Sequence, residues 1–175
     1  AYEISALTNN GLPVTGVAKV VYPCSSKYIV ESKSIKLYFN SFNMTKLGDT
    51  SKEVREEIGR RASVDLSELL EVDVEVKIFS NREVLDAKVT PRYEWMHLDF
   101  EYQTLEEVYP IEGVEFSVYQ ETPELLKVID NPLKDKTIKY HSALLKSNCR
   151  VTSQPDWGDV YIEFKGEKAV DPISL

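Results

Sequence analysis

The sequence predicts an α+β protein of two modules, built mainly of strands with a few helices. Three observations predict this class: a hairpin pattern over residues 2–22, two helical patterns over residues 32–62, and a strictly alternating strand over residues 71–79. Strands and helices that follow one another in separate runs are typical of an α+β fold.

Residues 2–22 are predicted to form a β-hairpin. The segments YEISAL and VTGVAKVVY flank TNNGLP, in which Asn-Asn-Gly and Pro favour a turn. The next segment, ESKSIKLYFNSF, predicts an amphipathic helix that starts near residue 32, because its apolar residues recur at helical spacing. These residues are Ile35, Tyr38, Phe39 and Phe42.

A second helix is predicted in DTSKEVREEIGRRA, where Thr50 and Glu53 have the spacing of a capping box. The segment EVDVEVKIF alternates valine and isoleucine with charged residues, which is the period of a half-exposed strand. YEWMHLDFEY and GVEFSVY are also predicted to be extended. TPELLKVI is predicted to form a short helix with Thr122 as its cap and Pro123 in its first turn.

From residue 136 the order of the opening elements returns. KTIKYHSALLKSNCRVT and DVYIEFKG are two predicted strands around a turn in SQPDWG, and DPISL has the pattern of a helix start. The same order describes residues 2–46. We therefore predict two related modules, over residues 1–110 and 111–175, of which the second is incomplete.

The composition is that of an ordinary globular protein, with 42% hydrophobic and 29% charged residues. No apolar run approaches the roughly 20 residues of a membrane helix, and the N-terminus lacks a signal-peptide pattern, so we expect a cytoplasmic protein without membrane contact. The formal charge of −8 argues against a nucleic-acid partner. A small anionic ligand needs only a local group of lysines, and the clearest group is Lys33 and Lys36.

The stretch KSNCRVTSQPDWG places Cys149 seven positions before Asp156. A nucleophilic thiol needs donors and a group that manages its proton, because its ordinary pKa of about 8.5 leaves it mostly protonated. Lys146, Asn148 and Thr152 are candidate donors, and a turn in QPDWG would bring the Asp156 carboxyl back towards the thiol. The alternative is a buried core cysteine beside an ordinary turn aspartate, and spacing alone favours that alternative.

Two segments taken together carry a family resemblance. ESKSIKLYFNSF resembles the signature E-S-K-S-hydrophobic-K-L-Y, and LLKSNCRVTSQPDWG resembles the catalytic segment S-N-C-x-V/I-T-x-Q-P-D, of the QueF nitrile reductases. These enzymes are NADPH-dependent 7-cyano-7-deazaguanine reductases. The cysteine segment comes second, which resembles the two-module form of the family. The resemblance implies tunnelling-fold (T-fold) modules, in which an antiparallel sheet carries helices on one face.

The resemblance implies roles for residues in both segments, in the reduction of the nitrile to an aminomethyl group during queuosine synthesis for tRNA. Cys149 matches the nucleophile that forms a thioimide with the nitrile carbon, and Asp156 matches the proton donor. The substrate-binding positions are Val30, Glu31 and Ser32. The NADPH-binding positions are Ser32, Lys33 and Lys36. The resemblance also implies a homo-oligomer, with a homodimer favoured.

The chain departs from the two-module pattern at its C-terminal end. A His-Asn-Glu-Phe-His-Glu run and an Arg-Gly-Gly segment, which follow the catalytic segment in the family, do not occur in it. The resemblance is close over residues 28–46 and 144–164 and loose elsewhere. Whether these 175 residues are active alone is therefore left open.

Two other classes of function also stay open. One is a non-catalytic purine-binding or assembly module on the same fold. The other is a different cysteine-nucleophile enzyme, which would need a histidine near Cys149, and His141 is the nearby candidate. We expect His141 and His97 to be strand residues without a catalytic role, and Cys24 to be structural. The cysteine and histidine spacings of a metal site are absent, so we expect no metal and no disulfide.

Overall fold

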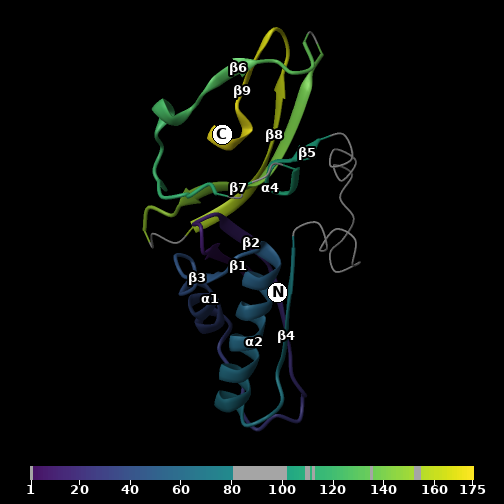
Figure 1. Cartoon of the computed structure of the whole chain (residues 1–175). Coiled ribbons are helices and arrows are strands. Elements are labelled where there is room, and N and C mark those ends of the chain that lie inside the picture. The colour runs from purple at the N-terminus through teal and green to yellow at the C-terminus, as the bar shows by residue number, and fades with distance from the viewer. Residues whose placement is uncertain (1, 81–101, 109–110, 112, 135, 152–154) are drawn as a thin grey trace. The chain divides into compact units, whose positions relative to one another are not determined.

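The computed structural model describes residues 2–80, 102–108, 111, 113–134, 136–151 and 155–175. The chain divides into two compact units, Ala1–Arg92 and Tyr93–Leu175 (Figure 1). The predicted module boundary at residue 110 stays a prediction. None of the described helices is long and apolar enough to cross a membrane.

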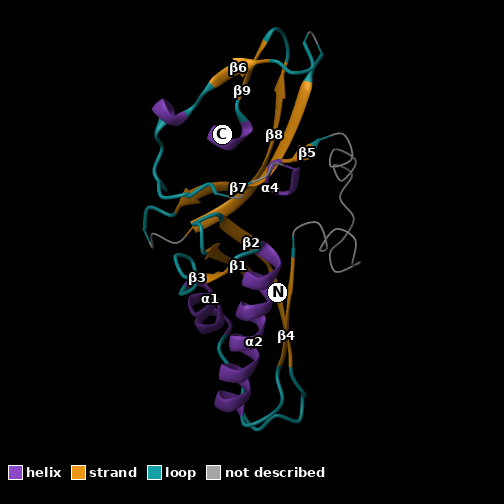
Figure 2. Ribbon diagram, in the orientation of Figure 1, coloured by secondary structure: helices purple, strands orange, loops and turns teal. Residues whose placement is uncertain are grey.

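Unit 1 contains a four-stranded sheet in the order β3-β1-β2-β4 (Figure 2). β1 (Tyr2–Thr8) and β2 (Pro13–Val21) form an antiparallel hairpin, which confirms the predicted one. β4 (Glu75–Phe79) pairs antiparallel with β2, whereas β3 (Lys46–Gly48) pairs parallel with β1. The turn between β1 and β2 favours a glycine at Gly11, because its φ of 89° lies in the left-handed region.

Both predicted helices of unit 1 are confirmed. α1 (Ser32–Asn40) begins at the predicted position, and α2 (Ser51–Leu70) begins with the predicted capping box. In this box, Thr50 and Glu53 each accept a hydrogen bond from the other's backbone N–H. α2 runs beyond the predicted segment because its buried stripe continues to its last residue.

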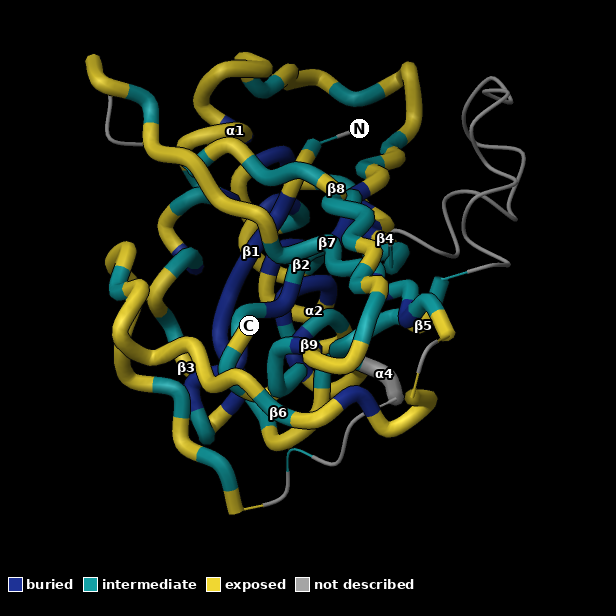
Figure 3. The backbone as a smooth tube through the Cα atoms, turned by 90° about the horizontal axis from the view of Figure 1, so that it is seen from above, coloured by how far each residue is buried: buried dark blue, intermediate teal, exposed yellow. Residues whose placement is uncertain are grey.

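The two helices pack on one face of the sheet, which confirms the α+β prediction. The strand residues in this core include Ile4, Ala6, Val14 and Ala18, all at even-numbered positions and hence on one face. They pack with Phe39 of α1 and with the buried stripe of α2. Figure 3 shows most of β1 as buried.

The three strands predicted after α2 within residues 71–119 have different outcomes. The strand expected over residues 71–79 is present only from Glu75 onward, because Glu71 ends α2 in the left-handed conformation with φ 54°. GVEFSVY forms no strand in the described residues 113–119. YEWMHLDFEY lies outside the described residues except for Tyr102.

Unit 2 contains a three-stranded sheet and a two-stranded sheet. In the first, β7 (Ile138–Asn148) lies between β5 (Gln103–Thr104), parallel to it, and β8 (Pro155–Phe164), antiparallel to it. In the second, β6 (Val128–Asp130) pairs antiparallel with β9 (Lys168–Val170). The two strands predicted from residue 136 onward are therefore confirmed, with β8 starting earlier than expected.

Short helices complete unit 2: α4 (Leu105–Val108) and the 3₁₀ helices η2 (Pro123–Leu125) and η3 (Pro172–Ser174). The helix predicted in TPELLKVI is wrong beyond its first turn, because the following residues pair in β6. The helical turn predicted in DPISL is observed. A small core joins the sheets, in which the buried Tyr140 of β7 packs with Ala169 of β9.

Glu57 on α2 couples the stability of unit 1 to pH. Its carboxylate accepts hydrogen bonds from Nε of Arg60 (2.8 Å) and Arg61 (2.7 Å), and these bonds lower its pKa from 4.5 to about 2. A carboxyl group whose pKa is lower in the folded chain than in the unfolded chain stabilises the fold at pH values above its unfolded-state pKa. This stabilisation is lost as the pH falls through its folded-state pKa.

We expect Glu57→Gln to lower the free energy of unfolding by about 0.5–1 kcal/mol at neutral pH, since solvent screens a surface pair. Most of this difference should disappear near pH 2, where the carboxylate of the unchanged chain is itself half protonated. Urea unfolding at both pH values measures the effect. Glu56→Gln, whose carboxylate lies 3.8 Å from Lys52 Nζ, is the control and should change less.

Candidate active site

Cys149 and Asp156 lie where β7 and β8 of unit 2 are connected. Cys149 directly follows the last residue of β7, and Asp156 is the second residue of β8. In the register, Ser147 lies opposite Asp156. Side chains alternate between the two faces of a strand, so Ser147 shares the face of Asp156, and Cys149 follows one residue beyond the end of β7.

The prediction that QPDWG forms a turn is wrong for its last four residues. Residues 155–158 belong to β8 and pair with residues 145–148 of β7, so the connection is confined to residues 149–154. Pro155 is tolerated there because it is the first residue of the strand. A strand, rather than a turn, therefore places Asp156 beside β7.

The two faces of this hairpin differ in character. Cys149 is half-buried and in no disulfide, and Asp156 is exposed. Lys146 and Trp157 pair on the opposite face, where Nζ lies 5.7 Å from the centre of the indole ring. Lys146 and Asn148 lie on the face opposite to Asp156, their role as donors to the thiol stays a prediction, and the third candidate, Thr152, lies outside the described residues.

Glu31 caps the N-terminus of α1. Its carboxylate accepts hydrogen bonds from the backbone N–H of Lys33 (2.9 Å) and of Ser34 (2.7 Å), and from the Ser34 hydroxyl (3.0 Å). The two backbone bonds are the main reason that the pKa of Glu31 lies below its usual value. The carboxylate therefore stays ionised at neutral pH, and its predicted contact with substrate stays a prediction.

The other predicted binding residues surround this cap. Ser32, Lys33 and Lys36 are exposed, and the two lysines are neighbours on one side of α1. Val30 is half-buried and packs against the core of unit 1. Because Glu31 occupies two helix amides, an anion at this helix end would be met by the lysine ammonium groups instead.

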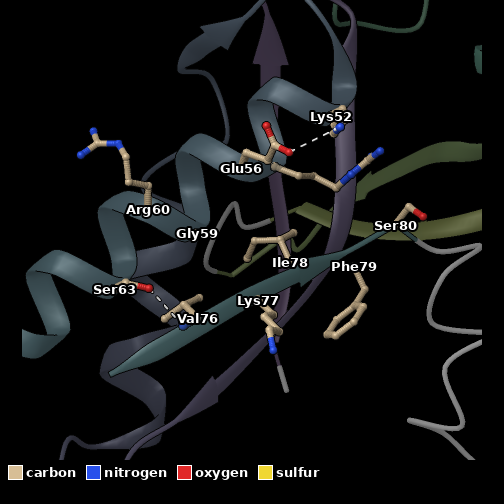
Figure 4. A pocket seen from close by; sticks show the side chains of 11 residues that line it. Lys52, Glu56, Gly59, Arg60, Ser63, Val76, Lys77, Ile78, Phe79 and Ser80 are labelled. Atoms are coloured by element: carbon tan, nitrogen blue, oxygen red, sulfur yellow. Dashed lines mark hydrogen bonds and ion pairs between the residues drawn. The ribbon is translucent and has the colours of Figure 1, made fainter. Parts of the chain in front are cut away.

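The structure gathers the predicted residues into two groups, one in each unit. Val30 to Lys36 lie around the start of α1, and Cys149 and Asp156 lie on the β7–β8 hairpin. A groove of about 640 Å³ between α2 and β4 is lined by neither group (Figure 4). Among the described residues, no three His, Cys, Asp or Glu side chains are placed to hold a metal ion.

His141 lies in β7 as a strand residue, as expected. Its Nε2 atom lies 3.2 Å from Asp159 Oδ1, and its ring stacks on Tyr161 with the centres 4.7 Å apart. Because it pairs with Tyr161, it lies on the face opposite to Asp156, which disfavours a His–Cys pair with Cys149. His97 lies outside the described residues, and Cys24 is exposed in the loop after β2.

Sequence reasoning missed Glu106 of α4, which contacts the middle of β7. Its Oε1 atom accepts hydrogen bonds from the Ser142 hydroxyl (2.7 Å) and from the Ala143 backbone N–H (3.0 Å). These partners are 36 and 37 positions away in the chain. No local pattern in the sequence predicts a contact between residues so far apart in the chain.

The sequence of the chain is similar to the sequences of known nitrile reductases. Residues 1–78 match the family model described as "Nitrile reductase, 7-cyano-7-deazaguanine-reductase N-term". The chain is 37% identical over 167 residues to the NADPH-dependent 7-cyano-7-deazaguanine reductase of Legionella pneumophila strain Lens, covering 95% of this chain and 52% of the relative. It is 36% identical over 175 residues to the reductase of that name from Desulfotalea psychrophila, covering 100% of this chain and 56% of the relative.

The first 78 residues thus have the sequence of a nitrile-reductase N-terminal module. Together with the relatives, this match supports the resemblance to the QueF nitrile reductases seen in the two motifs. The chain spans about half the length of the curated relatives it matches.

Proposed function

We propose that this chain carries the nitrile-reducing site of a 7-cyano-7-deazaguanine reductase. The observation that supports the proposal is that Ser147 lies opposite Asp156 and Cys149 directly follows β7, in a sequence similar to such reductases over nearly its whole length. The product would be 7-aminomethyl-7-deazaguanine, a precursor of queuosine in tRNA. We also propose a cytoplasmic homodimer that binds no nucleic acid, which the net charge of −8 supports.

Cys149 performs the first step of the proposed reaction. Its sulfur forms a bond to the nitrile carbon while one π bond of the C≡N group breaks, and the nitrogen takes up a proton to give a neutral thioimide. The thiol loses one proton and the nitrogen gains one, so the step is balanced without an oxidant or a reductant. Asp156, which lies opposite Ser147 near the end of β7, passes this proton from sulfur to nitrogen.

NADPH, when bound, would supply one hydride per molecule, and two molecules are needed to convert a thioimide into an amine. Lys33 and Lys36 would hold its phosphates, since both ammonium-bearing side chains are exposed beside the start of α1. Ser32 lies at the same helix end. The C–S bond to Cys149 would break between the two hydride transfers, and uptake of a proton by the released thiolate would restore the thiol for the next substrate.

Glu31 can cap α1 and bind the substrate at the same time. A carboxylate has about four acceptor positions, and the three hydrogen bonds within the chain use one on Oε1 and two on Oε2. The remaining position on Oε1 suits a ring N–H of the deazaguanine. The lowered pKa keeps this acceptor ionised.

The proposal is tested by measuring how many molecules of NADPH are oxidised for each molecule of nitrile converted. With 7-cyano-7-deazaguanine present, the chain is expected to oxidise two molecules of NADPH for each nitrile converted, measured by NADPH absorbance and by mass spectrometry of the product. Binding of the nitrile without any oxidation would overturn the proposal and favour a purine-binding module. Benzonitrile, which lacks the purine-like ring, is the control substrate and should not be reduced.

A further inference from the structure

The hairpin that carries the proposed site contains a β-bulge. Ser142 of β7 lies opposite Val160 of β8, and Leu145 lies opposite Gly158. Between these pairs, β7 holds two residues, 143 and 144, whereas β8 holds only residue 159. One extra residue is therefore inserted into β7, which is the definition of a bulge.

The bulge decides which face of the sheet the last residues of β7 occupy, directly before Cys149. Before it, the buried Ile138 and Tyr140 place the even-numbered residues of β7 on the core face. After it, the odd-numbered residues take that face, because a one-residue insertion exchanges the two faces of a strand. β8 continues without an insertion, so the exposed Asp156 lies on the same face of β8 as Ile162 and Phe164, beyond the core of unit 2.

Without the extra residue, the end of β7 would be out of register with Asp156. If β7 kept its pairing of Ser142 with Val160 and ran on regularly, Ser147 would lie opposite Pro155 instead of Asp156. Lys146, and not Ser147, would then lie opposite Asp156. The bulge thus places Ser147, two residues before Cys149, on the face of Asp156 while Ile138 and Tyr140 stay in the core of unit 2.

Glu106 satisfies the backbone at this bulge. A bulge removes backbone groups from the ladder, and here Glu106 Oε1 accepts the N–H of Ala143 at 3.0 Å together with the Ser142 hydroxyl at 2.7 Å. The Ser142 oxygen in turn accepts the N–H of Leu144 at 3.1 Å. Both amides of the inserted segment therefore depend directly or indirectly on Glu106.

The burial of the second carboxylate oxygen of Glu106 without a partner indicates that the contact of Glu106 with the bulge is not optimised for stability alone. Oε2 is buried and has no hydrogen-bond partner among the described residues. Burial of a polar atom without a partner is unfavourable. A neutral residue would avoid that penalty but would leave the bulge amides without their acceptor.

We propose that Glu106 is a positioning residue, which holds the bulge of β7 and thereby keeps the end of β7, from which Cys149 follows, in register with Asp156. The effect of Glu106 on catalysis rests on the proposed function, whereas its effect on the register of β7 does not. It assigns no direct contact between Glu106 and the substrate.

The test compares Glu106→Ala, Glu106→Gln and a control, Glu163→Ala. Glu163 also accepts two side-chain bonds in unit 2, from Tyr102 and Lys139, but neither is at the bulge. Two quantities are measured: the rate of covalent adduct formation at Cys149 with 7-cyano-7-deazaguanine, by intact mass, and the cross-strand NMR contact between Ser147 and Asp156. The NMR contact reports the pairing register of β7 and β8 and does not depend on any nitrile chemistry.

Glu106→Ala is expected to slow adduct formation on the order of tenfold to a hundredfold, because a small misplacement of reacting groups is costly, and to weaken the NMR contact. Glu106→Gln keeps the Oε1 acceptor and is expected to restore both, and Glu163→Ala is expected to change neither. If Glu106→Ala does not fold, Ser142→Ala, which removes one bond to the carboxylate, should show the same two changes more weakly.

Normal adduct formation and an intact NMR contact in Glu106→Ala would overturn the inference, as would equal damage in Glu106→Gln. Absence of an adduct in the unchanged chain would instead overturn the proposed function. In that case the NMR contact alone decides the inference: its loss in Glu106→Ala supports the role of Glu106 at the bulge, and its persistence refutes it.

Discussion

Replacing Cys149 by serine is expected to abolish NADPH oxidation with 7-cyano-7-deazaguanine. Serine keeps nearly the size of cysteine and can still donate a hydrogen bond. Its hydroxyl is far less acidic than a thiol, whose ordinary pKa is about 8.5, so a nucleophilic anion is not available at neutral pH. Without the sulfur there is no thioimide to reduce, and NADPH absorbance should stay at the level of the protein-free control.

Cys24→Ser is the matched control for this substitution. Cys24 is exposed in unit 1, in the loop after β2, and belongs to neither group of predicted site residues. This variant should keep the full rate. NADPH oxidation that survives in Cys149→Ser but is lost in Cys24→Ser would contradict the assignment of the nucleophile.

Asp156→Asn is expected to slow adduct formation at Cys149 by on the order of 10²–10⁴-fold, the usual contribution of general acid–base catalysis. Asparagine has the shape of aspartate but cannot take a proton from the thiol and deliver it to the nitrile nitrogen. Asp156 is exposed, so the free energy of unfolding should change by no more than about 0.5 kcal/mol. Stopped incubations followed by intact-mass measurement give the rate.

Asp159→Asn provides the control on the same strand. Asp159 lies in β8, where its Oδ1 atom is 3.2 Å from His141 Nε2. This change also removes one negative charge from β8, but not at the residue opposite Ser147. Equal slowing in Asp156→Asn and Asp159→Asn would show a general effect of charge or strand stability and would argue against a specific role for Asp156.

The elements of unit 1 were predictable because their signals are local. The turn residues between β1 and β2, and the reciprocal spacing of Thr50 and Glu53, act within a few positions of the chain. The cap at Glu31 lies within a motif that the sequence also singled out. In these places each local preference agrees with the final packing.

Unit 2 shows where local signals fail. Pro and Gly in QPDWG favour a turn, yet pairing with β7 makes these residues a strand. TPELLKVI has a helix-start pattern, yet pairing of Val128–Asp130 with β9 limits the helix to one turn. In both cases a partner strand distant in sequence overrides the propensity of the segment.

The candidate site was predictable in its residues but not in its geometry. The two motifs identified Cys149 and Asp156, but nothing in their spacing shows that an inserted residue in β7 sets the register between the end of β7 and Asp156. The bulge depends on Glu106, which precedes it by 36 positions, and on the core that fixes the first half of β7. Such a register follows only from the paired strands.

The most direct test of the account is the mass of the intact chain after incubation with 7-cyano-7-deazaguanine in the absence of NADPH. We predict a mass gain of one substrate molecule, located at Cys149 by peptide mapping and absent in Cys149→Ala. Such an adduct requires only the thiol, its proton acceptor and a site for the nitrile, and therefore isolates the chemistry of the β7–β8 hairpin. An unchanged mass, or an adduct that persists in Cys149→Ala, would contradict the central claim that this thiol is the nucleophile of a nitrile-reducing site.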